Sequence, residues 1–170
     1  MTDICDNAGA ENTADQQARK GDPMREVLEH HFIETFSLPQ DATNWLLSLW
    51  DAIQFMDDVA DEDEISRDQF DNALYQMLIG MPANPFFMAR ATVLLPVMMT
   101  AILKWQASDL LETAGEADAR TYMWRAGYYD VVLLVVHLCH GHNTALDLGP
   151  FVLKLYGERL EDYKKEFCDA

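Results

Sequence analysis

The apolar residues of this chain recur at helical intervals along most of its length. Between residues 41 and 61 they form one stripe at spacings of three and four, which comprises Leu46, Leu49, Trp50, Ile53, Met56 and Ala60. Similar patterns predict further helices over residues 23–36, 66–79, 85–111, 116–139 and 145–167. No strand pattern occurs. We therefore expect an all-α fold, a single-domain bundle of five to six helices whose short loops make most neighbours antiparallel.

Several residues predict where these helices begin, bend and end. Ser66 and Asn84 are suited to N-caps, and Gly141 is suited to a helix end. The segment Gly-Met-Pro-Ala-Asn-Pro at residues 80–85 predicts a break between helices. Pro96 falls inside the helix predicted over 85–111 and predicts a kink there.

Two segments of the chain are apolar enough to be considered as membrane spans. The segment 86–103 is interrupted by Arg90 and Pro96, and the segment 131–139 is too short to span, since a span needs about 20 apolar residues. We expect both to be buried core helices, with the second in the central helix of the bundle, and we expect no membrane association.

The organisation of the chain follows from where this pattern starts. Residues 1–23 lack apolar periodicity and are rich in Asp, Asn, Gln and Gly, which predicts a flexible acidic tail. Residues 24–170 are expected to form one all-helical domain. The 170 residues, of which 49% are hydrophobic, suit a single domain with a sizeable core.

The charge of the chain restricts its partners. There are 29 Asp and Glu against 12 Lys and Arg, a net charge of −17, which predicts no direct nucleic-acid binding. No Lys or Arg occurs between Arg25 and Arg67. That interval holds eleven acidic residues: Glu26, Glu29, Glu34, Asp41, Asp51, Asp57, Asp58, Asp61, Glu62, Asp63 and Glu64. We expect this surface to bind a protein partner with a basic surface.

The cysteines and the first residues bear on cellular location. Cys5, Cys139 and Cys168 are odd in number and lie far apart without a CxxC pair, which fits a reducing compartment. Asp3 and Asp6 stand where a signal peptide carries basic residues. A cytoplasmic location is expected.

An aspartate cluster ends the helix predicted over residues 41–61 and is the main candidate site. Asp57 lies within about 20° of Leu46 and Trp50 on the helical wheel, so it points toward the core, and Asp61 lies one turn further along. Asp58 faces outward. A carboxylate aimed at a core requires compensation, which is a hydrogen-bond donor, a cationic partner such as an arginine, a metal ion such as Mg²⁺, or a proton. The candidate arginines are Arg90, Arg120 and Arg125.

The spacing Asp57-Asp58-x-x-Asp61 resembles the aspartate-rich motif of class I isoprenoid synthases. In that family the motif ends a helix and holds Mg²⁺ on the diphosphate of the substrate, so the resemblance implies Mg²⁺ as a cofactor. It covers five of the 170 residues, and the chain has no clear second metal-binding motif.

The helix predicted over residues 116–139 carries polar residues among apolar ones. Asp130 and His137 are seven residues apart and share a face. One hypothesis has them face Asp57 and Asp61 across the bundle and complete a metal site. The alternative is that Asp130 and Arg125 form structural ion pairs and that His137 is a core histidine with satisfied hydrogen bonds.

Three functions compete on this basis. The first is an acidic interaction or accessory protein, of phage or prophage type by its size and acidity, that binds a basic or nucleic-acid-binding protein. The second is a Mg²⁺-dependent enzyme that acts on a phosphate or diphosphate compound through Asp57 and Asp61. The third is an assembly component that oligomerises through exposed aromatic faces. The first requires the fewest assumptions, and the oligomeric state does not follow from the sequence.

Overall fold

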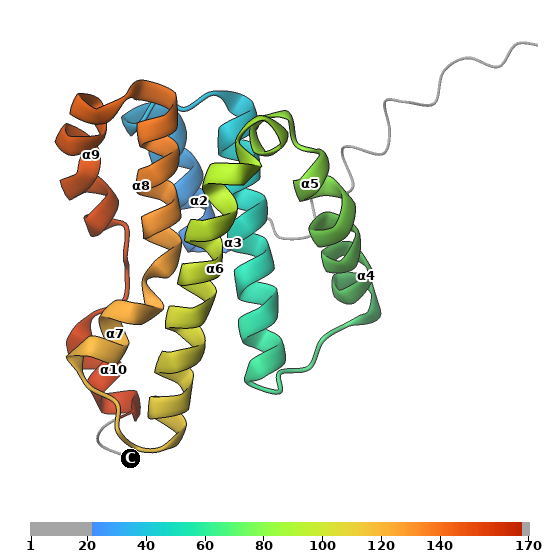
Figure 1. The fold of residues 1–170 in the computed structure, drawn as a ribbon. Coiled ribbons are helices and arrows are strands. Elements are labelled where there is room, and N and C mark those ends of the chain that lie inside the picture. The colour runs from blue at the N-terminus through green and yellow to red at the C-terminus, as the bar shows by residue number, and fades with distance from the viewer. Residues whose placement is uncertain (1–21, 168–170) are drawn as a thin grey trace, which may run out of the picture.

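The computed structural model describes residues 22–167, which form helices and no strand (Figure 1). The elements are α2 (Pro23–His30), the π-helical turn η1 (His31–Thr35), α3 (Gln40–Ala60), α4 (Arg67–Tyr75), the π-helical turn η2 (Gln76–Gly80), α5 (Met81–Ala83), α6 (Pro85–Thr113), α7 (Ala119–Arg125), α8 (Gly127–His140), α9 (His142–Lys154) and α10 (Leu160–Phe167). The all-α prediction is confirmed for this range, but the helices there are more numerous than the five to six expected. Residues 1–21 of the predicted tail lie outside it.

The predicted helix caps are confirmed. Ser66 Oγ accepts a hydrogen bond from the backbone N–H of Gln69, and the Gln69 side chain accepts one from the backbone N–H of Ser66. Helix α4 therefore begins with a capping box. Asn84 Oδ1 accepts from the first backbone N–H groups of α6. Gly141 ends α8 with φ of 84°, a conformation that favours glycine.

The predicted break at residues 80–85 is shorter than expected. The helix that starts at Arg67 continues through η2 and α5 to Ala83, and only Asn84 is extended. Met81 N donates to Gln76 O, five residues back, so the hydrogen-bond spacing has already changed before Pro82, which has no N–H to donate.

Two predicted helices are each divided in two. The helix expected over residues 116–139 is interrupted at Ala126, next to Gly127, whose backbone lies close against Ala101 of α6. The helix expected over residues 145–167 starts earlier, at His142, and is interrupted by residues 155–159. Tertiary hydrogen bonds hold that connection, because Tyr129 donates to Leu155 O and Tyr122 donates to Glu158 O.

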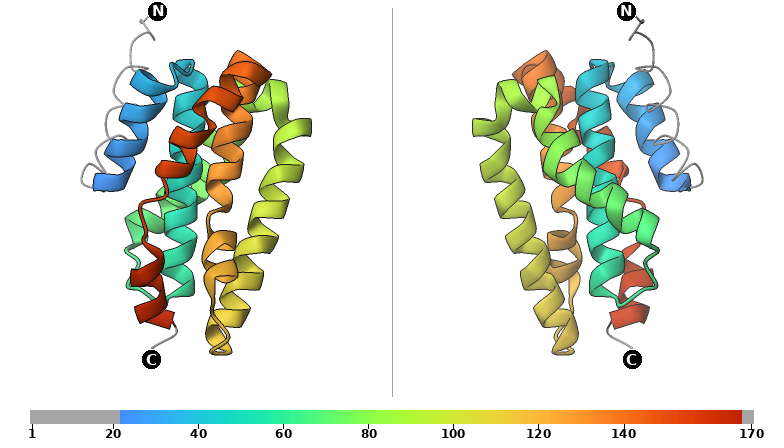
Figure 2. Two further views of the ribbon diagram at one scale, coloured as in Figure 1. Left: turned by 90° about the vertical axis from the view of Figure 1, so that its left-hand side faces the viewer. Right: turned by 90° about the vertical axis from the view of Figure 1, so that its right-hand side faces the viewer.

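The core lies between α3 and α8 and extends to α2 and η1. Leu28, Phe32, Trp45 and Leu46 are fully buried there, as are four valines of α8: Val131, Val132, Val135 and Val136. Figures 1 and 2 show α8 between α6 and α9, which confirms the central place predicted for it.

The prediction that residues 86–103 form a buried core helix is wrong. These residues lie in α6, which forms one edge of the bundle in both views of Figure 2. Only 11% of the most apolar 18-residue segment of α6 is buried. By length and composition alone, α6 is the one helix in the described range that could cross a membrane. The periodicity misled here because α6 is apolar on nearly all sides, a pattern that does not distinguish a buried helix from an exposed apolar one.

Candidate functional site

The acidic turn that follows α3, which consists of residues 61–64, is exposed to solvent. The turn is ordered by its own backbone: Asp61 N donates to Asp57 O and Asp63 N donates to Asp58 O, both at 2.9 Å. Glu62 has φ of 60°, a left-handed conformation that reverses the chain at this point. The four carboxylates of this turn, from Asp61 to Glu64, therefore extend into solvent next to Asp58 at the end of α3.

A shallow apolar groove lies beside the acidic turn. It has a volume of about 540 Å³ and is lined by Val59 of α3, by Ile65 and Ser66 of the connection, and by Arg67 and Phe70 of α4. The ring of Phe70, which lines the groove, lies 6.4 Å from the ring of Phe55 of α3. Val59 and Phe70 are about half-exposed. The end of α3 thus presents apolar surface and negative charge side by side.

Three of the eleven acidic residues between Arg25 and Arg67 are neutralised by arginine. Arg25 pairs with Glu29 and Asp51, and Arg125 pairs with Asp57. The remaining eight form no ion pair with another residue of the described range, and they are Glu26, Glu34, Asp41, Asp58, Asp61, Glu62, Asp63 and Glu64. Five of these eight are at or next to the acidic turn.

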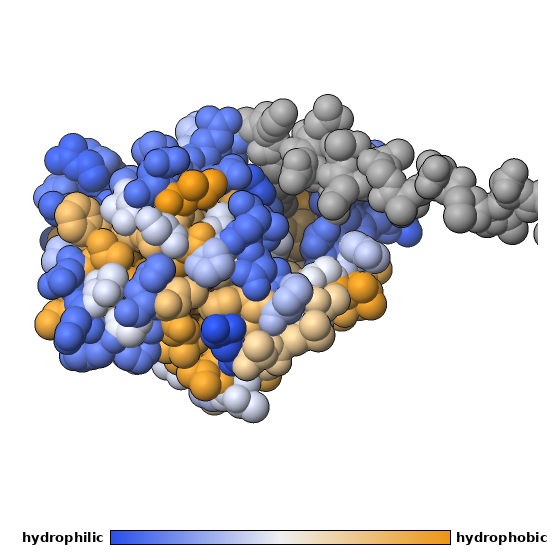
Figure 3. Space-filling model, turned by 90° about the horizontal axis from the view of Figure 1, so that it is seen from above, coloured by the Kyte–Doolittle hydropathy of each residue, from blue (hydrophilic) through white to orange (hydrophobic). Residues whose placement is uncertain are grey.

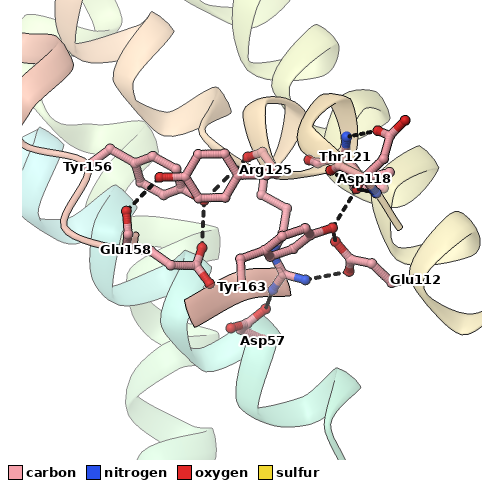
Figure 4. Close-up of polar contacts among 10 residues, drawn as sticks. Asp57, Glu112, Asp118, Thr121, Arg125, Tyr156, Glu158 and Tyr163 are labelled. Atoms are coloured by element: carbon pink, nitrogen blue, oxygen red, sulfur yellow. Dashed lines mark hydrogen bonds and ion pairs between the residues drawn. The ribbon is translucent and has the colours of Figure 1, made fainter. Parts of the chain in front are cut away.

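Asp57 points toward the protein interior, as its place on the helical wheel predicted. Its Oδ1 lies 3.5 Å from the Arg125 guanidinium, so Arg125 is the partner among the three arginines considered (Figure 4). Burial raises the pKa of Asp57, Arg125 opposes this, and the nearby charges of Asp61 and Asp58 raise the pKa further. The Trp105 side chain also lowers the pKa of Asp57, less than Arg125 does.

Arg125 also joins Asp57 to a buried polar network that the sequence patterns did not identify. Its guanidinium donates to Glu112 Oε2 at 2.6 Å, and the Glu112 side chain is only 4% exposed. Tyr163 of α10 donates to Glu112 Oε1 at 2.6 Å (Figure 4). Burial raises the pKa of Tyr163, so its hydroxyl stays protonated and able to donate. The available signal was Glu112 itself, a carboxylate near the end of a mostly apolar helix.

The same network fixes the start of α7. Asp118 caps α7 by accepting from Arg120 N at 2.7 Å, and Thr121 Oγ1 lies 2.5 Å from the Tyr163 hydroxyl. The hydrogen bonds from Arg120 lower the pKa of Asp118 to about 2. The network therefore connects α3, α6, α7 and α10, and its polar side chains form hydrogen bonds and ion pairs with one another.

Asp130 and His137 lie elsewhere on the bundle. Asp130 pairs with Lys104 of α6 at 2.6 Å, and the His137 ring lies 6.2 Å from the ring of His142. Both residues border an open hollow of about 580 Å³ between α8 and α9. Within residues 22–167, no hydrogen bond or ion pair joins either of them to Asp57 or Asp61. Residues 22–167 contain no group of three or more His, Cys, Asp and Glu that could hold a metal ion.

These positions separate the predicted site residues into two groups. Asp57, Asp58 and Asp61 lie together at the end of α3, whereas Asp130 and His137 belong to the α8–α9 side. The interpretation of Asp130 and Arg125 as members of ion pairs is confirmed. The interpretation of His137 as a core histidine is wrong, because His137 is exposed to solvent. Comparison of the chain with protein-family models, with curated proteins and with solved structures finds no match.

Proposed function

We propose that this protein is an interaction protein that binds a basic segment of a partner protein at the acidic turn and its adjacent groove. The observation that carries the proposal is a set of five carboxylates without a cationic partner in the described range: the four exposed ones of residues 61–64 and the half-buried Asp58 beside them. A protein with so much unneutralised charge at one end attracts cationic surfaces over long range.

The groove gives this surface a preference beyond charge. Apolar side chains of a partner would bury Val59 and Phe70, while its Lys or Arg side chains would reach the carboxylates at the rim. Arg67 borders the groove but its guanidinium is held by Asp71 at 2.8 Å, so it does not neutralise the turn. The partner that fits is an amphipathic basic segment, such as those of nucleic-acid-binding proteins, in a cytoplasmic setting.

The proposal is tested with a synthetic amphipathic peptide of Lys and Leu, titrated calorimetrically into the full chain at low and high salt. The double variant Asp61→Asn/Asp63→Asn changes the acidic turn. The matched control Glu26→Gln/Glu34→Gln removes the same charge from α2 and η1, where both residues are exposed and form no ion pair with a described residue.

Binding is expected to weaken roughly 3- to 10-fold in the turn variant, since an exposed ion pair contributes about 0.2–1 kcal/mol. The control should bind almost as tightly as the wild type, and added salt should weaken binding in all three proteins. Equal losses in both variants, or binding that salt leaves unchanged, would refute a specific site at the turn.

A Mg²⁺-dependent enzyme is the second candidate, and one observation favours it. The charges of Asp61 and Asp58 each raise the pKa of Asp57, so both neighbours disfavour its ionised form. A hard divalent cation at Asp57 and Asp61 would offset this effect and could bridge to phosphate oxygens of a substrate. Arg125 competes for Asp57 in such a site.

Titration with Mg²⁺, Mn²⁺ and Zn²⁺ tests this candidate, with Asp57→Ala/Asp61→Ala as the comparison. Stoichiometric binding in the wild type and its loss in the variant would support a metal site, and a screen of diphosphate compounds would follow. Metal affinity that is the same in both proteins would exclude the candidate.

A further inference from the structure

The outward face of α6 carries a stripe of exposed side chains spaced three and four residues apart. Its members are Met88, Thr92, Leu95, Met99, Leu103, Gln106 and Leu110. Each of the five apolar members has more than half of its surface exposed. This spacing is typical of the seam by which one helix packs against another. No element of the described range covers it, and Figure 3 shows hydrophobic side chains exposed along one side of the molecule.

The stripe is symmetric about Met99. Leu95 and Leu103 stand four residues to either side of it, Thr92 and Gln106 seven residues, and Met88 and Leu110 eleven residues. If two such helices run antiparallel, with a two-fold axis at Met99, every apolar residue meets an apolar one. The two polar residues, Thr92 and Gln106, then lie opposite each other and can hydrogen-bond.

We infer that a second copy of this chain covers this face, with the two α6 helices packed antiparallel about a two-fold axis at Met99. A symmetric stripe satisfies the requirement of a two-fold interface that the same patch be complementary to itself. An unrelated partner or a lipid surface gives no reason for the spacing to be symmetric.

The size of the face is sufficient for such a contact. From Met88 to Leu110 the stripe spans about 33 Å at 1.5 Å per residue. Ile102 borders it and is also exposed. These side chains together offer several hundred Å², of the order of the ~800 Å² per partner in a standard stable interface.

The two cations near the stripe, Arg90 and Lys104, do not oppose a contact between two copies. The Arg90 guanidinium lies 4.5 Å from the Phe86 ring, and Lys104 is held by Asp130, so both cations are engaged on the protein's own surface. The stripe itself is uncharged. The net charge of −17 on each copy acts over a longer distance and is screened by salt, so added salt should strengthen the association. Binding of a basic partner at the acidic turn has the opposite salt dependence, so the two proposals can fail separately.

The association is tested by sedimentation of the full chain over a range of concentrations and salt. We expect a species of twice the 19.4 kDa chain mass, favoured by salt. Met99→Glu should shift the chain to monomer at concentrations where the wild type is dimeric. Leu153→Glu is the matched control, since Leu153 is an exposed leucine of α9, away from the stripe, and this variant should remain dimeric. Circular dichroism checks that both variants are folded.

Cross-linking tests the symmetry axis. In a background with Cys5, Cys139 and Cys168 changed to Ser, Met99→Cys should form a disulfide with its own copy under mild oxidation. Met88→Cys should not, because in the antiparallel pair the two copies of residue 88 lie about 33 Å apart. Met88→Cys mixed with Leu110→Cys should cross-link.

Three results would overturn the inference: a monomer at every concentration and salt, a Met99→Glu variant as dimeric as the wild type, or cross-linking of Met88→Cys to itself. Binding of a monomeric wild type to phosphatidylcholine vesicles, lost in Met99→Glu, would assign the face to a membrane instead and would also overturn it.

Discussion

Arg125 at the end of α7 and Glu112 at the end of α6 form a 2.6 Å ion pair across the turn that connects the two helices. Glu112 is almost fully buried, and its second oxygen accepts from Tyr163. A buried carboxylate with both oxygens engaged holds α7 and α10 against α6, because leaving any of these groups unpaired is costly.

Removal of the Glu112 carboxylate should therefore destabilise the fold strongly. We expect Glu112→Ala to lower the free energy of unfolding by about 3 kcal/mol, since Arg125 is left partly buried without its closest partner. Urea denaturation measures this. Glu161→Ala is the control: Glu161 is exposed and 3.8 Å from Arg159, so its loss should cost less than about 0.5 kcal/mol. Equal costs would contradict the role of the network.

The Tyr163 hydroxyl should make a smaller contribution. Tyr163→Phe keeps the ring in the core but removes the donor to Glu112, so we expect a loss of about 1–2 kcal/mol in the same denaturation assay. Tyr75→Phe should be neutral, since Tyr75 is exposed and its hydroxyl has no recorded hydrogen bond in the described range. A neutral Tyr163→Phe would show that water replaces the bond.

Asp57 should make stability depend on pH in a direction opposite to that of most carboxylates. Because its pKa in the folded protein is above the ordinary value of 3.8, ionisation costs more in the folded than in the unfolded state. That cost is fully present above the raised pKa and disappears as pH falls below 3.8. Asp57→Asn should thus have a higher Tm than the wild type at about pH 7, and the difference should shrink toward about pH 3.5. A lower Tm for Asp57→Asn at neutral pH would mean that Arg125 dominates.

Gly127 should not tolerate a side chain. A Cβ there would lie 2.9 Å from Ala101 Cβ and 3.0 Å from its Cα, so α6 and α8 would have to separate. We expect Gly127→Ala to cost about 1–3 kcal/mol in thermal or urea unfolding. Gly149→Ala is the matched control inside α9, where the nearest atom is 3.8 Å away, and it should stabilise by up to about 1 kcal/mol. A stabilising Gly127→Ala would show that the helices adjust without cost.

The candidate site was predictable to the extent that it depends on a single helix. The wheel position of Asp57 required an inward carboxylate, and the candidate partners included Arg125. Glu112 and Tyr163, which complete the network, lie 55 and 106 residues further along the chain than Asp57. Periodicity within one helix carries no information on contacts at such separations.

The sequence by itself determined the all-α class, the caps at Ser66, Asn84 and Gly141, and the concentration of negative charge after α3. These features depend on backbone hydrogen bonds and side-chain spacing within a few residues. Tertiary structure alone decided that two of the expected helices divide. The helix expected over 116–139 divides next to Gly127, which packs closely against Ala101 of α6. The helix expected over 145–167 divides at residues 155–159, where Tyr129 and Tyr122 donate hydrogen bonds to the backbone carbonyls of Leu155 and Glu158. Tertiary structure also decided that α6, apolar on nearly all sides, lies at the edge of the bundle, since such a pattern does not distinguish a buried helix from an exposed apolar one.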